Sequence, residues 1–254
     1  MSGEPFRFFW RFPSDAGAFS ASNTASGFDV DNLKRSTLDK KWRSDEFGSA
    51  LVETVTVDLG SAQAITAFVL LDHDLIDTDV LVLRFASDSG FTTDVGTVAI
   101  TFRENTLVEF FAAVTRQYWR LEITALLDTA VRQAGRLLLG PHYEMERSLA
   151  LGYTVGPGQD TGKTIRTQGG QLYGDLGVRL KMLGGEFVAM QEADNVEVDA
   201  LKNANGKSVP LFVAMDWTNF PLKKSLYGTL TQVGSSINIG VERWSFPLRM
   251  LEQK

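Results

Sequence analysis

Hydrophobic and polar residues alternate with a period of two along much of the first half of the chain. In residues 51–59, Val55, Val57 and Leu59 fall on one side, and threonine and aspartate occupy the other. This alternation predicts a β-strand with one buried face and one face in water. Gly60-Ser61 then predicts a turn, and the apolar run 65–71 predicts a strand buried on both faces.

Shorter runs of the same kind follow, separated by residues that favour turns. We expect strands at 80–87, 97–102, 107–111, 118–124 and 135–141. The second and third should form a hairpin around residues 103–105. In 118–124 the alternation places Trp119, Leu121 and Ile123 on the inner face. Many short strands with turn signals between them are typical of a β-sandwich or jelly roll.

The second half of the chain has a less regular pattern. Strands are expected at 164–168, 172–183, 209–215, 226–233, 237–246 and 247–251, and the glycine-rich stretch 155–164 predicts a loop. One helix is expected at about 186–205, with Phe187, Met190, Val196 and Leu201 as its apolar stripe and Asn205-Gly206 as its end. The fold class is therefore mainly β, with a sandwich domain at 1–145 and a smaller β-rich domain with one helix at 146–254.

Composition narrows the possible functions. The chain has 254 residues, 44% of them hydrophobic and 22% charged, as in an ordinary globular protein. A net charge of −6 argues against nucleic acid as a partner. The absence of cysteine excludes disulfides and thiol chemistry. The N-terminus lacks the pattern of a signal peptide, and no apolar run is long enough for membrane insertion, so we expect synthesis in a cytoplasm.

The order of motifs from about residue 16 to residue 141 resembles the discoidin domain, also called the coagulation-factor type C domain. The matching pieces are ASNTASGFDVDNL, LDKKWRSD, VTVDLGSAQAITAFVLL, FASDSGFTTDV, YWRLEIT and AGRLLLG. The resemblance implies an eight-stranded jelly-roll sandwich without catalytic activity. It also implies that glycans, lipid headgroups or proteins bind at loops at one end of the sandwich.

Three aromatic residues are relevant to such loops. Trp42 is expected to fill the end of the core, and stacking on a ligand is the alternative. Phe28 and Phe91 are the loop aromatics that we predict as ligand contacts, together with His73.

No motif in the chain predicts catalysis or a bound cofactor. The acidic stretch 71–79 makes Asp72, Asp74 and Asp77 the candidates for calcium, with a solvated acidic loop as the alternative. The stretch 27–33 is a second, poorer calcium candidate. His73 and His142 belong to no hydrolase or zinc motif. GPGQDTGKT (156–164) imitates a phosphate-binding loop, but Pro157 stands where that loop requires glycine.

The C-terminal residues, from SVPLFVAMD to ERWSFPLRMLE, resemble the small β-domains of tail-tip proteins from long-tailed bacteriophages. This resemblance implies a minor or distal tail protein that assembles as a homo-oligomeric ring with other tail proteins in the virion tail. A ring needs head-to-tail contacts whose rotation closes.

The aromatic N-terminus FRFFWRF could serve such contacts through Phe6, Phe8 and Trp10, or it could be a first strand with these residues inward. Three hypotheses follow for the whole chain. The first is a structural tail-tip component that contacts glycan or the host surface through the discoidin-like domain. The second is a stand-alone carbohydrate-binding module or lectin, and the third is a glycan-degrading enzyme.

Overall fold

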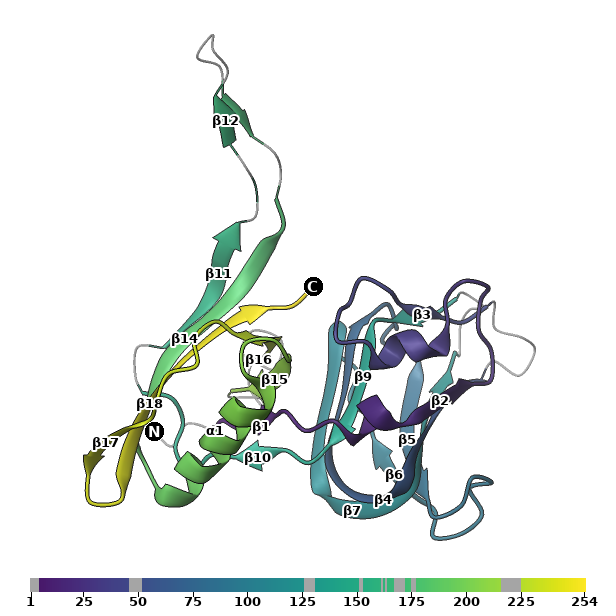
Figure 1. The fold of residues 1–254 in the computed structure, drawn as a ribbon. Helices are drawn as coiled ribbons and strands as arrows, with labels where there is room; N and C mark the ends of the chain where they lie inside the picture. Colours follow the sequence, from purple (N-terminus) through teal and green to yellow (C-terminus); the bar gives the residue numbers. More distant parts are fainter. Residues whose placement is uncertain are drawn as a thin grey trace. The chain divides into compact units, whose positions relative to one another are not determined.

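The computed structural model describes residues 5–45, 52–125, 131–150, 153–160, 162, 164–166, 172–174, 177–215 and 225–254. The chain divides into two compact units (Figure 1). Arg11–His142 form the sandwich unit, and Tyr143–Lys254 with the chain before Arg11 form the C-terminal unit. The expected domains, 1–145 and 146–254, differ from this division mainly at the N-terminus, because the first strand belongs to the sheet of the C-terminal unit.

The sandwich unit is mainly one sheet. Its strands are neighbours in the order β2 (Ala18–Ala21), β4 (Val52–His73), β7 (Asn105–Thr124), β5 (Val80–Ala86) and β6 (Gly96–Ala99), and β9 (Arg136–Gly140) also pairs with β4. A short pair, β3 (Trp42–Arg43) and β8 (Gln133–Ala134), and two 3-10 helices, η1 (Pro13–Ala16) and η2 (Val30–Lys34), complete the unit.

The two layers of the sandwich come from one bend in this sheet. β4 and β7 pair with each other on both sides of a register shift between Asp58 and Gln63. Gly60 at the shift has a φ of 75°, which side chains disfavour. Val55 and Val57 before the bend share a core cluster with residues after it, such as Phe68. The predicted turn at Gly60-Ser61 is therefore wrong in kind: the chain bends from one layer into the other while keeping its partner, as Figure 1 shows.

Two further predictions for this unit have opposite outcomes. The inward placement of Trp119, Leu121 and Ile123 is confirmed, since all three are buried. The hairpin between 97–102 and 107–111 is wrong: β6 pairs with β5, while residues 107–110 pair with β4. A loop closed by the Asp88 carboxylate, which accepts the N–H groups of Gly90, Thr92 and Thr93, returns the chain from β5 to β6.

The C-terminal unit contains a second sheet, with the described strands in the order β10-β1-β15-β16-β18-β14-β11. Their bounds are β1 (Arg7–Phe9), β10 (Tyr143–Glu144), β11 (Thr154–Asp160), β14 (Arg179–Met190), β15 (Leu211–Ala214), β16 (Ser225–Leu230) and β18 (Arg243–Glu252). β17 (Ile237–Gly240) forms a hairpin with the start of β18. β11 and β14 lead into a narrow arm with the short pair β12 (Thr164–Arg166) and β13 (Leu172–Gly174) (Figure 1).

Several elements of this unit differ from those that the sequence predicts. Residues 154–160, expected as a loop, form β11, because the extended 179–184 segment of β14 supplies a pairing partner. The expected strand at 172–183 is divided between β13 and β14, and that at 237–246 is divided at the turn residue Glu242, whose φ is 53°.

The helix α1 (Glu192–Asn205) is shorter than predicted. Phe187 and Met190 belong to β14 rather than to the helix, and Val196 is 55% exposed. The helix buries Val198 and Leu201 against the sheet, so only Leu201 of the predicted helical stripe lies on its buried face. The predicted end is confirmed, since Gly206 has a φ of 53° and its N–H bonds the Lys202 carbonyl.

The aromatic N-terminus is part of this core. β1 pairs with both β10 and β15, and Phe6 and Phe8 are buried. The Phe6 ring meets Phe187 edge to face, with 5.0 Å between the ring centroids. The prediction of Phe6 and Phe8 as docking residues is therefore wrong, because sheet pairing turns both side chains inward. Trp10 is partly buried against the same core.

This packing predicts that a substitution at the N-terminus weakens the unit at the other end of the sequence. Phe8→Ala should destabilise the C-terminal unit by about 3–5 kcal/mol, because it opens a cavity among buried aromatics. Hydrogen exchange measured by mass spectrometry should then speed up in 211–215 and stay unchanged in 55–71. Leu83→Ala, in the sandwich core, is the matched control and should give the reverse pattern.

Candidate functional site

The loops at one end of the sandwich form the candidate site. Ala21, the last residue of β2, pairs with Val55, and Val80, the first residue of β5, pairs with Thr124. These registers bring the chain after β2 and the chain before β5 to the same end of the unit. The β3–β8 pair lies there as well, because the Ala25 N–H donates to the Arg43 carbonyl at 2.9 Å.

The loop 22–28 is fastened at both of its ends. The Ser22 N–H donates to the Thr54 carbonyl, and the Phe28 carbonyl accepts the Arg43 N–H at 3.4 Å. Within the loop, the Phe28 N–H donates to the Ala25 carbonyl across a turn in which Gly27 has a φ of 84°. The turn leaves the Phe28 side chain 36% exposed. The guanidinium carbon of Arg43 lies 5.4 Å from the centroid of its ring. Phe28 is therefore an exposed aromatic residue with a guanidinium over its ring, at the end of a polar loop.

A buried carboxylate holds the start of this loop. Glu53 on β4 is buried and accepts hydrogen bonds from the Ser22 hydroxyl and, at 3.2 Å, from the Asn23 amide. Trp42 is also buried, and its indole N–H donates to the Thr24 hydroxyl at 3.3 Å. Trp42 thus fills the core end, as the first of its two interpretations proposed, and does not stack on a ligand.

A buried ion pair joins the neighbouring loops. The Arg132 guanidinium donates twice to the Asp79 carboxylate, at 2.8 and 2.9 Å, and the two side chains are 3% and 0% exposed. The Asp79 carboxylate also accepts the Ile76 N–H, and the Ser44 hydroxyl accepts the Arg132 N–H. Three segments that are distant in sequence are therefore held together under the candidate site.

The predicted calcium ligands have separate partners. Asp72 pairs with Lys41 at 2.9 Å, and Asp74 accepts the Gln133 N–H at 2.7 Å. Within the described ranges, no three His, Asp or Glu side chains gather as a metal site requires, so Asp72, Asp74 and Asp77 do not form such a cluster. In the second candidate stretch, Asp29 accepts the Asp31 N–H at the start of η2, and Asp31 pairs with Lys34.

The remaining predicted contacts lie elsewhere in the unit. His73 is buried and lies edge-on to Phe102, so it is not a ligand contact in this conformation. Phe91 follows β5, whose last residue Ala86 pairs with Tyr118, at the end opposite Phe28. Its ring is covered by the guanidinium of Arg120, with 3.9 Å from the guanidinium carbon to the ring centroid. Of the predicted contacts, only Phe28 lies exposed at the loop end of the sandwich.

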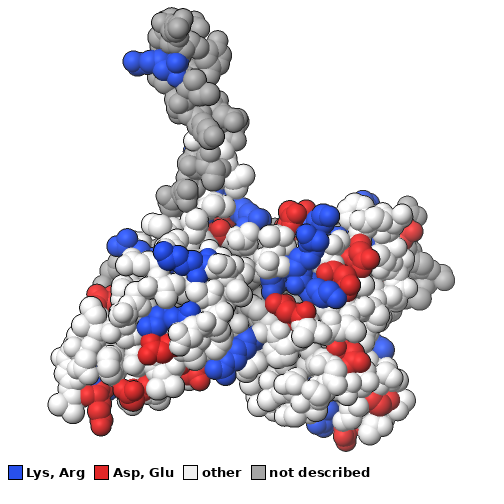
Figure 2. Space-filling model, viewed as in Figure 1, with Lys and Arg blue, Asp and Glu red and all other residues white. Residues whose placement is uncertain are grey.

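Charges and membrane features add little to the site. On the face shown in Figure 2, Lys and Arg side chains are interspersed with Asp and Glu, without a broad area of one sign. Among the described residues, no helix has the length and apolar content that a membrane crossing requires. The polar groups around Phe28 can accept and donate hydrogen bonds.

Comparisons with known proteins concern the fold. No family model and no curated protein matches the chain. Chitosan-binding module 1 from a Paenibacillus chitosanase/glucanase is 19% identical, with a TM-score of 0.44 over 52% of this chain and 99% of the module. The lectin domain of lectinolysin, solved with Lewis B antigen, is 13% identical, with a TM-score of 0.42 over 51% of this chain and 95% of that domain.

A third similar structure is a family 32 carbohydrate-binding module from Clostridium perfringens, solved with GalNAc-β-1,3-galactose. It is 12% identical, with a TM-score of 0.42 over 51% of this chain and 99% of the module. All three similarities span about half of this chain, and none of the three structures is a tail protein.

The buried ion pair gives a test of how the loops are held. Asp79→Asn leaves the Arg132 charge buried without its partner and should destabilise the sandwich unit by about 3–5 kcal/mol. Hydrogen exchange should then increase in 74–79 and 131–134. Lys41→Met, which removes the more exposed ion pair with Asp72, should cost less than about 1 kcal/mol. Equal effects of the two substitutions would contradict the anchoring role.

His73 predicts a pH dependence. Burial lowers the pKa of His73 from 6.5 to about 4. The neighbouring carboxylates of Asp72 and Asp79 act to raise this pKa, but the effect of burial is larger. Between these two pH values the unfolded chain binds a proton that the folded chain does not. The free energy of unfolding should therefore fall by up to about 3 kcal/mol as the pH decreases through this window. Denaturant titration should show this loss in the wild type, and His73→Leu should remove the part due to this residue.

Proposed function

We propose that the chain is a non-catalytic binding protein and that the loop end of its sandwich unit binds carbohydrate around Phe28. The observation that carries the proposal is the exposed Phe28 ring beside Arg43, at the end of a loop fastened on both sides. The resemblance of residues 16–141 to the discoidin domain supports the same end of the sandwich as the binding end.

The chemistry of sugars suits this arrangement. A sugar ring has an apolar C–H face that packs on an aromatic ring, and Phe28 is the exposed aromatic residue at this end of the sandwich. The hydroxyl groups of a sugar form hydrogen bonds with charged and amide side chains, such as the Arg43 guanidinium and the Asn23 amide. Glu53, on β4, accepts a hydrogen bond from the Asn23 amide and so holds this loop side chain in place, which reduces the side-chain entropy that is lost when a ligand binds.

A glycan array with the full chain, followed by calorimetry on the glycans retained, tests the proposal. Phe28→Ala should weaken binding at least about tenfold, which corresponds to the loss of about 1.4 kcal/mol of stacking. Phe91→Ala is the matched control: it removes a phenylalanine at the opposite end, covered by Arg120, and should leave the affinity unchanged. No binding to any glycan, or equal losses in the two variants, would overturn the proposal.

A tail-tip role is the second proposal, and it rests on the C-terminal unit. The sequence resemblance of its last strands supports it, as does the narrow arm beyond β11 and β14. A two-stranded ribbon is marginally stable alone in water, so an arm of this kind gains stability from a partner. Negative-stain electron microscopy of the purified chain tests this role, since closed rings of more than two copies support it, whereas particles of one or two copies do not.

A further inference from the structure

The outer face of the C-terminal sheet, which points away from the apolar core of this unit, exposes an unusual set of side chains. Side chains along β14 and β18 alternate between two faces: Leu183 and Phe187 are buried in the core, whereas Met182 and Glu186 point to the other side. Across the register, Glu186 pairs with Pro247 and Gly184 pairs with Arg249. Directly paired residues share a face. Met182, Glu186, Pro247 and Arg249 therefore lie together on the outer face.

This face carries exposed apolar side chains. Met182 and Val188 on β14 are exposed, and Ile237 on β17 is 60% exposed. Ile237 is paired with Ser245, two residues before Pro247 on β18, and so lies on the same face. Val241, at the tip of the hairpin, is 91% exposed. Apolar side chains that gather on one face mark an interaction surface, whereas scattered ones do not.

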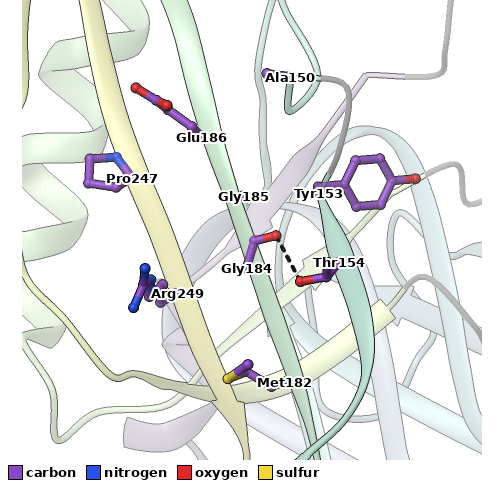
Figure 3. Close-up of a pocket in the computed structure, with 9 residues that line it drawn as sticks. All are labelled: Ala150, Tyr153, Thr154, Met182, Gly184, Gly185, Glu186, Pro247 and Arg249. Carbon is purple, nitrogen blue, oxygen red and sulfur yellow. Dashed lines mark hydrogen bonds between the residues drawn. The ribbon is translucent and has the colours of Figure 1, made fainter.

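A shallow groove of about 600 Å³ lies in the same face (Figure 3). Gly184 and Gly185 form its floor, and Tyr153 and Thr154 stand along one side. A Cβ atom at Gly184 would lie 3.3 Å from the Thr154 hydroxyl, so a side chain there would crowd this wall and fill the floor. A glycine floor in a strand permits the close approach of another chain.

The charges on this face complement each other. Arg249 is exposed, and its guanidinium has no ion-pair partner in the described part of the chain. The exposed Glu186 carboxylate accepts a hydrogen bond from the Ser245 hydroxyl. Glu186 projects from β14, the strand beside β18, and lies two register positions from Arg249 (Figure 3). When two copies of such a face meet across a twofold axis between these positions, each Glu186 faces the Arg249 of the other copy.

The edge strand favours the same occupant. Residues 233–241, which include β17, contain no charged residue. Natural proteins protect sheet edges with charges, proline or very short strands. The other two edges have such protection: β11 carries Pro157 with a register shift, and β10 has two residues and a charged pair between Arg7 and Glu144. Among the edge strands that the structure describes, β17 is thus the one without a charged residue or proline.

We propose that the outer face of the C-terminal sheet, with its β17 hairpin, binds the same face of a second copy of this chain. The contact combines apolar packing of Ile237, Val188 and Met182 with two symmetric Glu186–Arg249 pairs. It involves residues of the C-terminal unit only and is therefore independent of carbohydrate binding by the sandwich unit.

Size-exclusion chromatography with light scattering on the full chain tests this contact. The wild type should have twice the chain mass of 28.0 kDa. Glu186→Arg and Arg249→Glu should each place like charges opposite one another and shift the mass to that of one chain. Because the pairs are symmetric, the double reversal Glu186→Arg with Arg249→Glu should restore the dimer.

Ile237→Lys should also separate the copies, since it places a charge in the apolar part of the contact. Val95→Lys, at an exposed valine of the sandwich unit, is the control and should leave the mass unchanged. Circular dichroism should show the same β content in every variant. A wild type that stays a single chain at all concentrations would overturn the proposal, and so would an assembly whose mass is unaffected by the charge reversals.

Discussion

The long pairing of β4 with β7 is the constraint on which the sandwich unit depends. Both strands continue through the bend at Gly60, so the same two segments supply both layers and the core between them. β2, β5 and β9 each add to one half of this pair. The ends of the layers are thereby fixed relative to each other, and the loops that leave them start from rigid positions.

At the loop end of the sandwich, hydrogen bonds from polar side chains hold the loops in position. Buried charged groups are costly unless they are paired, and both buried acids here, Glu53 and Asp79, are satisfied by groups from other loops. These contacts place an exposed aromatic ring on a firm base. The proposed contact with carbohydrate depends on this arrangement.

The C-terminal unit follows a different plan. Its sheet is completed by a strand from the start of the chain, and the edge-to-face contact of Phe6 with Phe187 closes its core. Among the residues that the structure describes, α1 and the apolar core cover one face of this sheet. The opposite face keeps aliphatic side chains and a complementary pair of charges in water, a composition that suits contact with another protein surface more than permanent exposure.

Local patterns in the sequence determined the parts of the structure that depend on neighbouring residues. The period-two alternation identified the inward set Trp119, Leu121 and Ile123, and Asn205-Gly206 marked the end of α1, because face and helix stop are properties of a short segment. The order of motifs was enough to place a discoidin-like sandwich in the first half. Phe28 was identifiable from the sequence as an aromatic residue in a loop, and its role as a ligand contact stays a prediction.

Only the tertiary structure decided what depends on partners distant in sequence. Phe6 and Phe8 could equally have been a docking surface or a core strand, and the choice came from β15, which lies about two hundred residues away and offers an open edge to β1. Gly60-Ser61 reads as a turn until β7 is seen to pair on both sides of it. The buried pair of Asp79 and Arg132 and the outer face with Glu186 and Arg249 have no local signature, since each joins residues that only the folded chain brings together.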